Sequence, residues 1–173
     1  HLIASAAGAH GIRDPLADSV FRIARESLRV SIPDVGGGFG MKNVLYPEYV
    51  LVLWAARRLG RPVQWIADRG EDFLGAVHGR DSIARARLAL DRDGRFLAMR
   101  ADNVSNVGAR AVSFSPLGKG SALVTGNYDI PVARVRSRAV FTNTVPTQAY
   151  RSSGRPEVTF AIERLIDLAA RKT

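Results

Sequence analysis

The stretch Val35-Gly-Gly-Gly-Phe-Gly-Met-Lys42 carries four glycines in the five positions from Gly36 to Gly40, and Phe39 is the only large side chain among them. Because glycine has no Cβ, this loop can adopt positive φ angles and bring its backbone N–H groups close to a bulky ligand. Leu28–Ile32 predicts a strand before the loop, and a helical pattern follows from about Tyr46. Such a strand, bare loop and helix start can form an anion site. Glycines that serve only a tight connection explain the same pattern equally well.

Neither common phosphate-binding motif fits this loop. A P-loop ends in Gly-Lys followed by Ser or Thr, but here Met41 separates Gly40 from Lys42, and Asn43 follows. The dinucleotide-binding motif requires a third glycine where Met41 stands. The loop therefore resembles neither of the two common phosphate-binding loops.

Length and composition restrict the class of protein. The chain has 173 residues, of which 46% are hydrophobic, so it can bury a core as one domain or as a piece of a larger one. We expect a single domain over residues 1–173, in the cytoplasm and without a membrane span. Cysteine is absent, which excludes disulfides and thiolate ligands within the chain. His1, His10 and His78 do not have metal-ligand spacing, and we expect no protein-ligated metal site.

The formal net charge is +9, and arginine supplies most of the positive charge. Nucleic acid, an acidic partner or an anionic cofactor can each account for such an excess. The arginines are scattered, often beside acids as in Asp91-Arg-Asp93, and no regular series of aromatic residues accompanies them. We therefore favour a solvated or subunit-facing surface over nucleic acid.

The hydrophobic periodicity predicts an α+β fold, with helices packed on one side of a mixed sheet. The expected helices are Gly11–Glu26, a buried helix Tyr46–Leu59 that Gly60 ends, and Val158–Arg171 with Pro156 and Glu157 in its first turn. The expected strands are Leu28–Ile32, Pro62–Ile66, Ser82–Leu90, Phe96–Val104 and Arg134–Asn143, the third and fourth forming a hairpin around Asp91–Gly94. Gly118–Pro131 is expected to be a loop.

A second stretch, Ala149-Tyr-Arg-Ser-Ser-Gly-Arg155, places two arginines, two hydroxyls and a glycine before a helix start. It too can hold an anion. Ordinary capping of the helix by Ser152 or Ser153 explains it better when it is taken alone. Beside the glycine loop, however, it suggests that both stretches bind one anionic ligand.

In this order, Val35–Lys42 and Ala149–Glu157 resemble the large subunit of the molybdenum hydroxylases, the family of xanthine dehydrogenase, aldehyde oxidases and aerobic carbon monoxide dehydrogenase. Nearly the whole chain takes part in the resemblance. Supporting phrases are Gly8–Asp14, Pro33-Asp34, Ala55–Val63, His78–Asp81, Asp93-Gly94, Thr142-Asn143 and Glu163-Arg164. The α+β fold expected above would then be the first half of the molybdopterin-binding region of the large subunit.

The resemblance implies a molybdopterin cofactor with molybdenum, in bacteria usually as the cytosine dinucleotide form. Gly37, Gly38, Phe39 and Gly40 match the loop that lies against the molybdenum centre, and Arg151 with Ser152 matches the loop that contacts the ligands of the metal. The family hydroxylates a small-molecule substrate, such as an aldehyde or an N-heterocycle, with water-derived oxygen. Its implied partners are the remainder of the large subunit and the iron–sulfur and flavin subunits, which carry electrons away.

The chain also departs from the family. Ala7 stands where the family usually has a glutamine that donates a hydrogen bond to the cofactor, and Ser152 stands where carbon monoxide dehydrogenase has a copper-binding cysteine. Asn43 and Ser153 differ from the residues of purine-specific enzymes. The Gly-Val-Gly-Glu motif with the catalytic glutamate does not occur here. We therefore assign no catalytic residue and expect no activity from this segment alone. A degenerate, non-catalytic assembly module of the same fold is the alternative.

Overall fold

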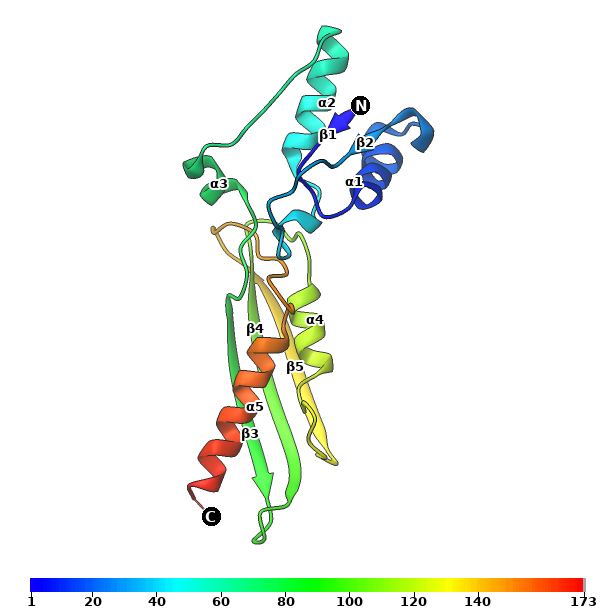
Figure 1. Cartoon of the computed structure of the whole chain (residues 1–173). Helices are drawn as coiled ribbons and strands as arrows, with labels where there is room; N and C mark the ends of the chain where they lie inside the picture. The colour runs from blue at the N-terminus through cyan, green and yellow to red at the C-terminus, as the bar shows by residue number, and fades with distance from the viewer. Residues whose placement is uncertain (173) are drawn as a thin grey trace. The chain divides into compact units, whose positions relative to one another are not determined.

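A computed structural model describes residues 1–172 of the chain. These residues form two compact units, His1–Ala76 and the part from Val77 onward. Figure 1 shows the elements of each unit in chain order. Within the described residues, no helix is both long enough and apolar enough to cross a lipid bilayer. They also contain no group of three or more acidic, histidine or cysteine side chains that could hold a metal ion.

The first unit contains two short parallel strands with helices around them. Strand β1 (Leu2–Ile3) pairs with β2 (Val30–Ser31). The helical segments are α1 (Ala9–Pro15), a π-helical turn (Leu16–Phe21), two 3₁₀ turns (Arg25–Ser27 and Met41–Asn43), α2 (Pro47–Leu59) and α3 (Arg69–Gly75). Asp68 caps α3 by accepting the Glu71 amide at 2.8 Å, while the Glu71 carboxylate accepts the Asp68 amide at 3.0 Å.

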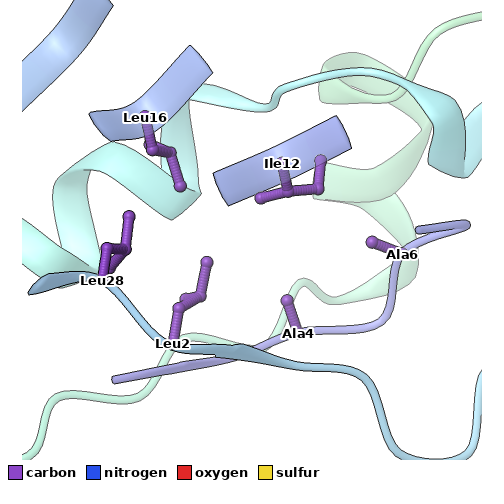
Figure 2. Packing of buried hydrophobic residues seen from close by; sticks show 6 residues of the cluster. All are labelled: Leu2, Ala4, Ala6, Ile12, Leu16 and Leu28. Atoms are coloured by element: carbon purple, nitrogen blue, oxygen red, sulfur yellow. The ribbon is translucent and has the colours of Figure 1, made fainter. Parts of the chain in front are cut away.

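The core of the first unit follows from two periodicities. Residues 2–6 alternate between buried and exposed, as an extended strand does, and residues 12 and 16 are one helical turn apart. In Figure 2, Ile12 and Leu16 point from the helix toward the extended segment. The cluster consists of Leu2, Ala4, Ala6, Ile12, Leu16 and Leu28.

Three predictions for the first unit are wrong in part or in whole. The helix Gly11–Glu26 ends at Phe21, because Arg22 adopts a left-handed conformation (φ 50°) that a helix cannot continue through. The strand Leu28–Ile32 is reduced to β2, and Pro62–Ile66 forms no strand. Period-two or apolar patterns over such short runs do not supply the neighbouring strand that a ladder needs.

Helix α2 is confirmed within one residue, and Gly60 (φ 64°) ends it as expected. The prediction that it is a buried helix is wrong, since none of its residues is buried. Only one side packs against the first core, and Leu51 and Trp54 are 59% and 54% exposed.

The second unit is built on a three-stranded mixed sheet. Strands β3 (Ser82–Leu90) and β4 (Phe96–Gly108) are antiparallel, and β5 (Ala133–Phe141) runs parallel to β4. Helices α4 (Ser115–Ala122) and α5 (Arg155–Ala170) contact this sheet (Figure 1). The α+β fold with a mixed sheet and packed helices is confirmed. The core between the layers contains Met99, Ala101, Val124 and Ile162.

The predicted hairpin is confirmed, with its turn held by the carboxylate of Asp91, which accepts the amides of Asp93 at 2.9 Å and Arg95 at 2.8 Å. The loop expected over Gly118–Pro131 is wrong at its start, because α4 extends to Ala122. The last helix begins at Arg155, three residues before the expected start. Its N-cap is Gly154, with no side-chain hydrogen bond, so capping by Ser152 or Ser153 is not observed.

Candidate functional site

The glycine loop has the backbone geometry that its composition predicts. Gly36, Gly37 and Gly40 have φ angles of 65°, 94° and 118°, and Phe39 adopts a left-handed φ of 50°. An alanine Cβ at Gly37 would lie 2.8 Å from Cε2 of the Phe39 ring. Within residues 1–172, the amides of Gly36, Gly37 and Gly38 donate no backbone or side-chain hydrogen bond. The loop thus presents a run of N–H groups to whatever lies against it.

Lys42 belongs to the support of this loop. Its Nζ donates to Ser5 Oγ at 2.6 Å and also to the carbonyl oxygen of Val35. The Ala7 amide donates to the Lys42 carbonyl at 3.0 Å, so the segment from Ser5 to Ala7 contacts both ends of the loop. The ammonium group is therefore held between two oxygens of the protein.

Two tyrosines hold the helix end of the loop and the neighbouring segment at Ser5. Tyr46 donates its hydroxyl to the Met41 carbonyl at 3.0 Å, and Tyr49 donates to the Ser5 carbonyl at 3.2 Å. Burial raises the pKa of the Tyr49 phenol above its ordinary value, with smaller contributions from Tyr46 and Glu48. The Tyr49 hydroxyl therefore stays protonated at neutral pH and keeps its donor role.

The second predicted stretch forms a loop with an unusual backbone. Ser152, Ser153 and Gly154 have consecutive positive φ angles of 64°, 37° and 86°. Two adjacent non-glycine residues in this region cost on the order of 1–3 kcal/mol each, so the surroundings must hold them there. Ser153 is buried and its Oγ lies 3.2 Å from Ser115 Oγ, whereas Arg151 and Ser152 are exposed.

The side chain that holds this loop is Arg80. Its Nη2 donates to the carbonyl oxygens of Tyr150 at 3.2 Å and Arg151 at 2.7 Å, and its guanidinium lies 4.7 Å from the centre of the Tyr150 ring. On the other side, its Nε lies 3.7 Å from Glu157 Oε1. Arg80 thus connects the loop to the first turn of α5 through charge-assisted contacts.

The approach of Arg80 to the loop depends on its neighbours. A Cβ at Gly79 would lie 2.5 Å from Tyr150 Cβ, so only glycine fits beside that residue. His78 donates its amide to the Pro146 carbonyl at 2.9 Å and accepts the Gln148 amide at 2.7 Å. Backbone pairing therefore brings residues 78–80 alongside residues 146–151.

A buried side-chain amide, that of Asn106, joins Asp81, the neighbour of Arg80, to the segment 142–144 that precedes this loop. The Nδ2 of Asn106 donates to Asp81 Oδ2 at 2.7 Å and to Thr144 Oγ1 at 2.8 Å, while its Oδ1 accepts the Gly108 amide at 2.7 Å and the Thr142 hydroxyl at 2.8 Å. Both donors and both lone pairs of the side chain are satisfied. Because no polar atom of the Asn106 side chain is left unpaired, its burial carries no desolvation penalty, and the network holds the surrounding backbone in one arrangement.

Replacing Arg80 with alanine is expected to lower the free energy of unfolding by about 2 kcal/mol, because two carbonyls lose a charged donor. Glu157 Oε2 is buried with no partner among the described residues, so removing Arg80 leaves the whole carboxylate without its cation. The additional change Glu157→Gln should recover part of the loss. Urea denaturation gives the free energies, and hydrogen exchange of residues 150–153 reports on the loop. Arg164→Ala, which breaks only an exposed pair with Asp167, is the control. Equal effects of Arg80→Ala and the control would contradict this role.

The comparison with known families decides the class of protein. Residues 1–173 match the family model described as the molybdopterin cofactor-binding domain. The chain belongs to this family. This confirms the resemblance to the large subunits of molybdenum hydroxylases.

Individual relatives support the same family assignment. The chain is 41% identical over 145 residues to the gamma subunit of the 6-hydroxypseudooxynicotine dehydrogenase complex of Paenarthrobacter nicotinovorans, and the match covers 83% of this chain and 18% of that protein. It is 38% identical over 155 residues to the carbon monoxide dehydrogenase large chain of Hydrogenophaga pseudoflava, covering 87% and 19%. The crystal structure of quinoline 2-oxidoreductase from Pseudomonas putida 86 superposes with a TM-score of 0.92 at 39% identity, covering 98% and 22%. The chain therefore spans about a fifth of the length of these relatives.

The residues singled out from the sequence fall into two groups. Gly37, Gly38, Phe39 and Gly40 lie together in the first unit, and Arg151 and Ser152 lie together in the second. Sequence reasoning missed Arg80, although the phrase His78-Gly-Arg-Asp81 drew attention to its neighbourhood. A glycine directly before an arginine was the available signal, since it lets another backbone approach that arginine closely.

Proposed function

We propose that the chain is a segment of a molybdenum hydroxylase large subunit in which both units form one domain, and that its two loops bind the cofactor. The observation that carries this proposal is the run of glycine amides without an acceptor in residues 1–172. Backbone N–H groups in a bare loop suit the phosphate and pterin groups of such a cofactor. Their fit depends on the absence of side chains at Gly37, Gly38 and Gly40.

The chain's own residues would bind and orient the cofactor. The amides of Gly37, Gly38 and Gly40 would donate to its oxygens, and the exposed ring of Phe39 would contact it. Arg151 and Ser152 would add a cation and a hydroxyl from the second loop. When bound, the cofactor supplies the oxidation chemistry itself, and the protein contributes position and electrostatics. No residue of this chain is proposed to act as the general base.

For the complete protein we propose hydroxylation of an aldehyde or an N-heterocycle with water-derived oxygen, with iron–sulfur and flavin subunits as partners. Support for a heterocycle comes from the names of similar proteins, among them the nicotine 6-hydroxylase large subunit of Paenarthrobacter nicotinovorans and the quinoline 2-oxidoreductase. We further propose the cytosine dinucleotide form of the cofactor. Acid release of the pterin from the complete natural protein, followed by mass spectrometry, tests this form. A pterin monophosphate alone, or none, would contradict it.

Ala7 favours the alternative, a non-catalytic module of the same fold. Position 7 lies beside the glycine loop, because its amide donates to Lys42 O at 3.0 Å, and its side chain is exposed. An alanine there offers no donor to a cofactor, whereas the usual glutamine of the family does. The fold is compatible with either residue.

Introducing Ala7→Gln into the complete natural protein is therefore expected to raise its affinity for the cofactor about tenfold, the value of one buried hydrogen bond of about 1.4 kcal/mol. Molybdenum and pterin per polypeptide, measured under limiting molybdate, report the change. Ser19→Gln, at an exposed site of the π-helical turn, is the control. Unchanged occupancy in Ala7→Gln would show that the glutamine position has no role in this protein.

A further inference from the structure

The face of the sheet directed away from α4 and α5 is an array of arginines. The strand register places Arg85 opposite Asp102 and Asp102 opposite Arg136. One row further along, Arg87 faces Arg100, and Arg100 faces Arg134. Arg138 lies opposite Val104, which also pairs with Ile83. The arginine face consists of Arg85, Arg87, Arg100, Arg134, Arg136 and Arg138, with Asp102 near its centre.

The direction of these side chains follows from their neighbours along each strand. Met99 and Ala101 of β4 are buried under the helices. Because side chains alternate along a strand, Arg100 and Asp102 point to the opposite face of the sheet. In β5, the hydroxyl of Ser137 contacts that of Ser121 in α4, which directs Arg136 and Arg138 to the opposite face. All six arginines are exposed.

This face concentrates the charge of the chain. Six arginines against one aspartate leave a formal charge of +5 on three strands, out of +9 for the whole sequence. Only one ion pair occurs on the face within the described residues, between Arg100 Nε and Asp102 Oδ2 at 3.1 Å. The row Arg87, Arg100 and Arg134 sets like charges directly opposite one another, which destabilises a sheet. An anionic surface against the face would offset this repulsion.

We propose that the arginine face docks against a carboxylate-bearing surface of the remainder of the same large subunit. The inference rests on the proposed function, because it takes the chain to be one segment of that subunit. About four fifths of the length of the similar proteins lies outside the matched region, which leaves ample chain to cover the face. Guanidinium groups pair bidentately with carboxylates, and arginine is enriched in protein interfaces.

Two features of the face favour a protein surface over nucleic acid. Asp102 lies between Arg85 and Arg136, where a carboxylate would repel a phosphate backbone. At one edge, Ile83 is 61% exposed and pairs with Val104, an apolar patch that a protein partner can cover and a phosphate chain cannot.

Arginine footprinting tests whether the face is covered. The complete natural protein, purified with its neighbouring subunits, is treated with phenylglyoxal, and modification of each arginine is followed by mass spectrometry. We expect Arg134, Arg136 and Arg138 to react at least about tenfold more slowly than in urea-denatured protein, and more slowly than Arg92 in the hairpin turn. Reaction as fast as that of Arg92 would overturn the proposal. Protection that disappears after nuclease treatment would overturn it in favour of nucleic acid.

A cross-link identifies what covers the face. Arg136→Lys places an amine there, and a carbodiimide joins it to any carboxylate in direct contact. Arg92→Lys is the control. Because Asp102 lies opposite residue 136, a link to Asp102 reports only the strand pairing. We expect a link from residue 136 to an Asp or Glu of the same polypeptide outside this segment. No link beyond Asp102, or a link to another subunit, would overturn the proposal. Neither experiment requires bound cofactor. If the arginines are protected in a protein that carries no molybdenum, only the proposed function is contradicted. If the arginines react in a protein loaded with molybdenum, only the docking proposal is contradicted.

Discussion

Replacing Gly154 with alanine is expected to lower the free energy of unfolding of the chain by about 2–4 kcal/mol. The new Cβ would overlap the carbonyl oxygen of Pro116 and lie 2.8 Å from the Gly120 amide nitrogen, so helix α4 would have to move away from the start of α5. Overpacking of this kind costs about 1–3 kcal/mol. The φ of 86° adds about 1 kcal/mol or more for a residue with a Cβ.

Two other glycines separate these contributions. Gly126 also has a positive φ, 58°, but its Cβ would meet only atoms at ordinary distances of 3.8 Å or more, so Gly126→Ala measures the backbone cost alone. Gly118 lies inside α4 with open space around it, and Gly118→Ala should stabilise the chain by about 0.5–1 kcal/mol. Urea denaturation of the three variants gives the comparison. If Gly154→Ala is no worse than Gly126→Ala, the close packing of α4 on the Gly154 turn is wrong.

Replacing Gly38 with alanine in the complete natural protein is expected to lower molybdenum and pterin occupancy at least tenfold with little change in stability. Gly38 is not among the residues with positive φ, and its Cβ would meet Lys42 Cβ at 3.5 Å, an ordinary contact. The fold therefore accepts alanine there. The proposed site does not, because the added methyl group would stand between the loop amides and the cofactor.

Gly75→Ala, at the end of α3 with open space around it, controls for the loss of a glycine in the same unit. Thermal unfolding and metal analysis are made on both variants. A normally loaded Gly38→Ala protein would mean that the cofactor does not lie against this loop. Loss of occupancy together with an unfolding temperature lowered by many degrees would show that Gly38 serves the fold instead.

Local sequence patterns predicted the second unit best. The hairpin of β3 and β4 could be predicted because a largely polar set of residues alternates with an apolar set over 83–90, and because Asp91–Gly94 has the composition of a turn. Helix α5 was legible from its apolar stripe and from Pro156 in its first turn. Helix α4 was missed because two glycines, Gly118 and Gly120, weaken the helical pattern of its sequence. Gly120 serves packing: a Cβ added there would lie 3.3 Å from Val158 Cγ1 and 3.4 Å from the Gly154 carbonyl oxygen.

The first unit was less predictable for a different reason. Its extended segments are held by side-chain contacts such as Lys42 to Ser5, residues far apart in the sequence, and not by long strands. The left-handed Arg22 that ends the π-helical turn has no signal in residue type, since glycine and asparagine are the usual residues there. The hydrophobic periodicity of the sequence therefore could not predict these long-range contacts or single backbone angles.

Part of the proposed site could be predicted from local sequence and part could not. The glycine loop and the Arg151–Ser152 stretch were recognised from their residue types, because glycine and small polar residues occur where the backbone adopts positive φ angles. Arg80 was not, because its role arises only when residues 78–80 pair with residues 146–151. The support that Lys42 gives the loop, through Ser5 and Val35, also depends on residues that only the fold brings together.

The most direct test of cofactor binding is the molybdenum content of the complete natural protein, expressed with its neighbouring subunits and an intact cofactor-maturation pathway. We predict close to one molybdenum and one pterin per polypeptide that contains this chain. A folded protein that carries neither, while a known molybdenum hydroxylase from the same cells is fully loaded, would contradict the account and leave a scaffold that keeps the fold without the chemistry.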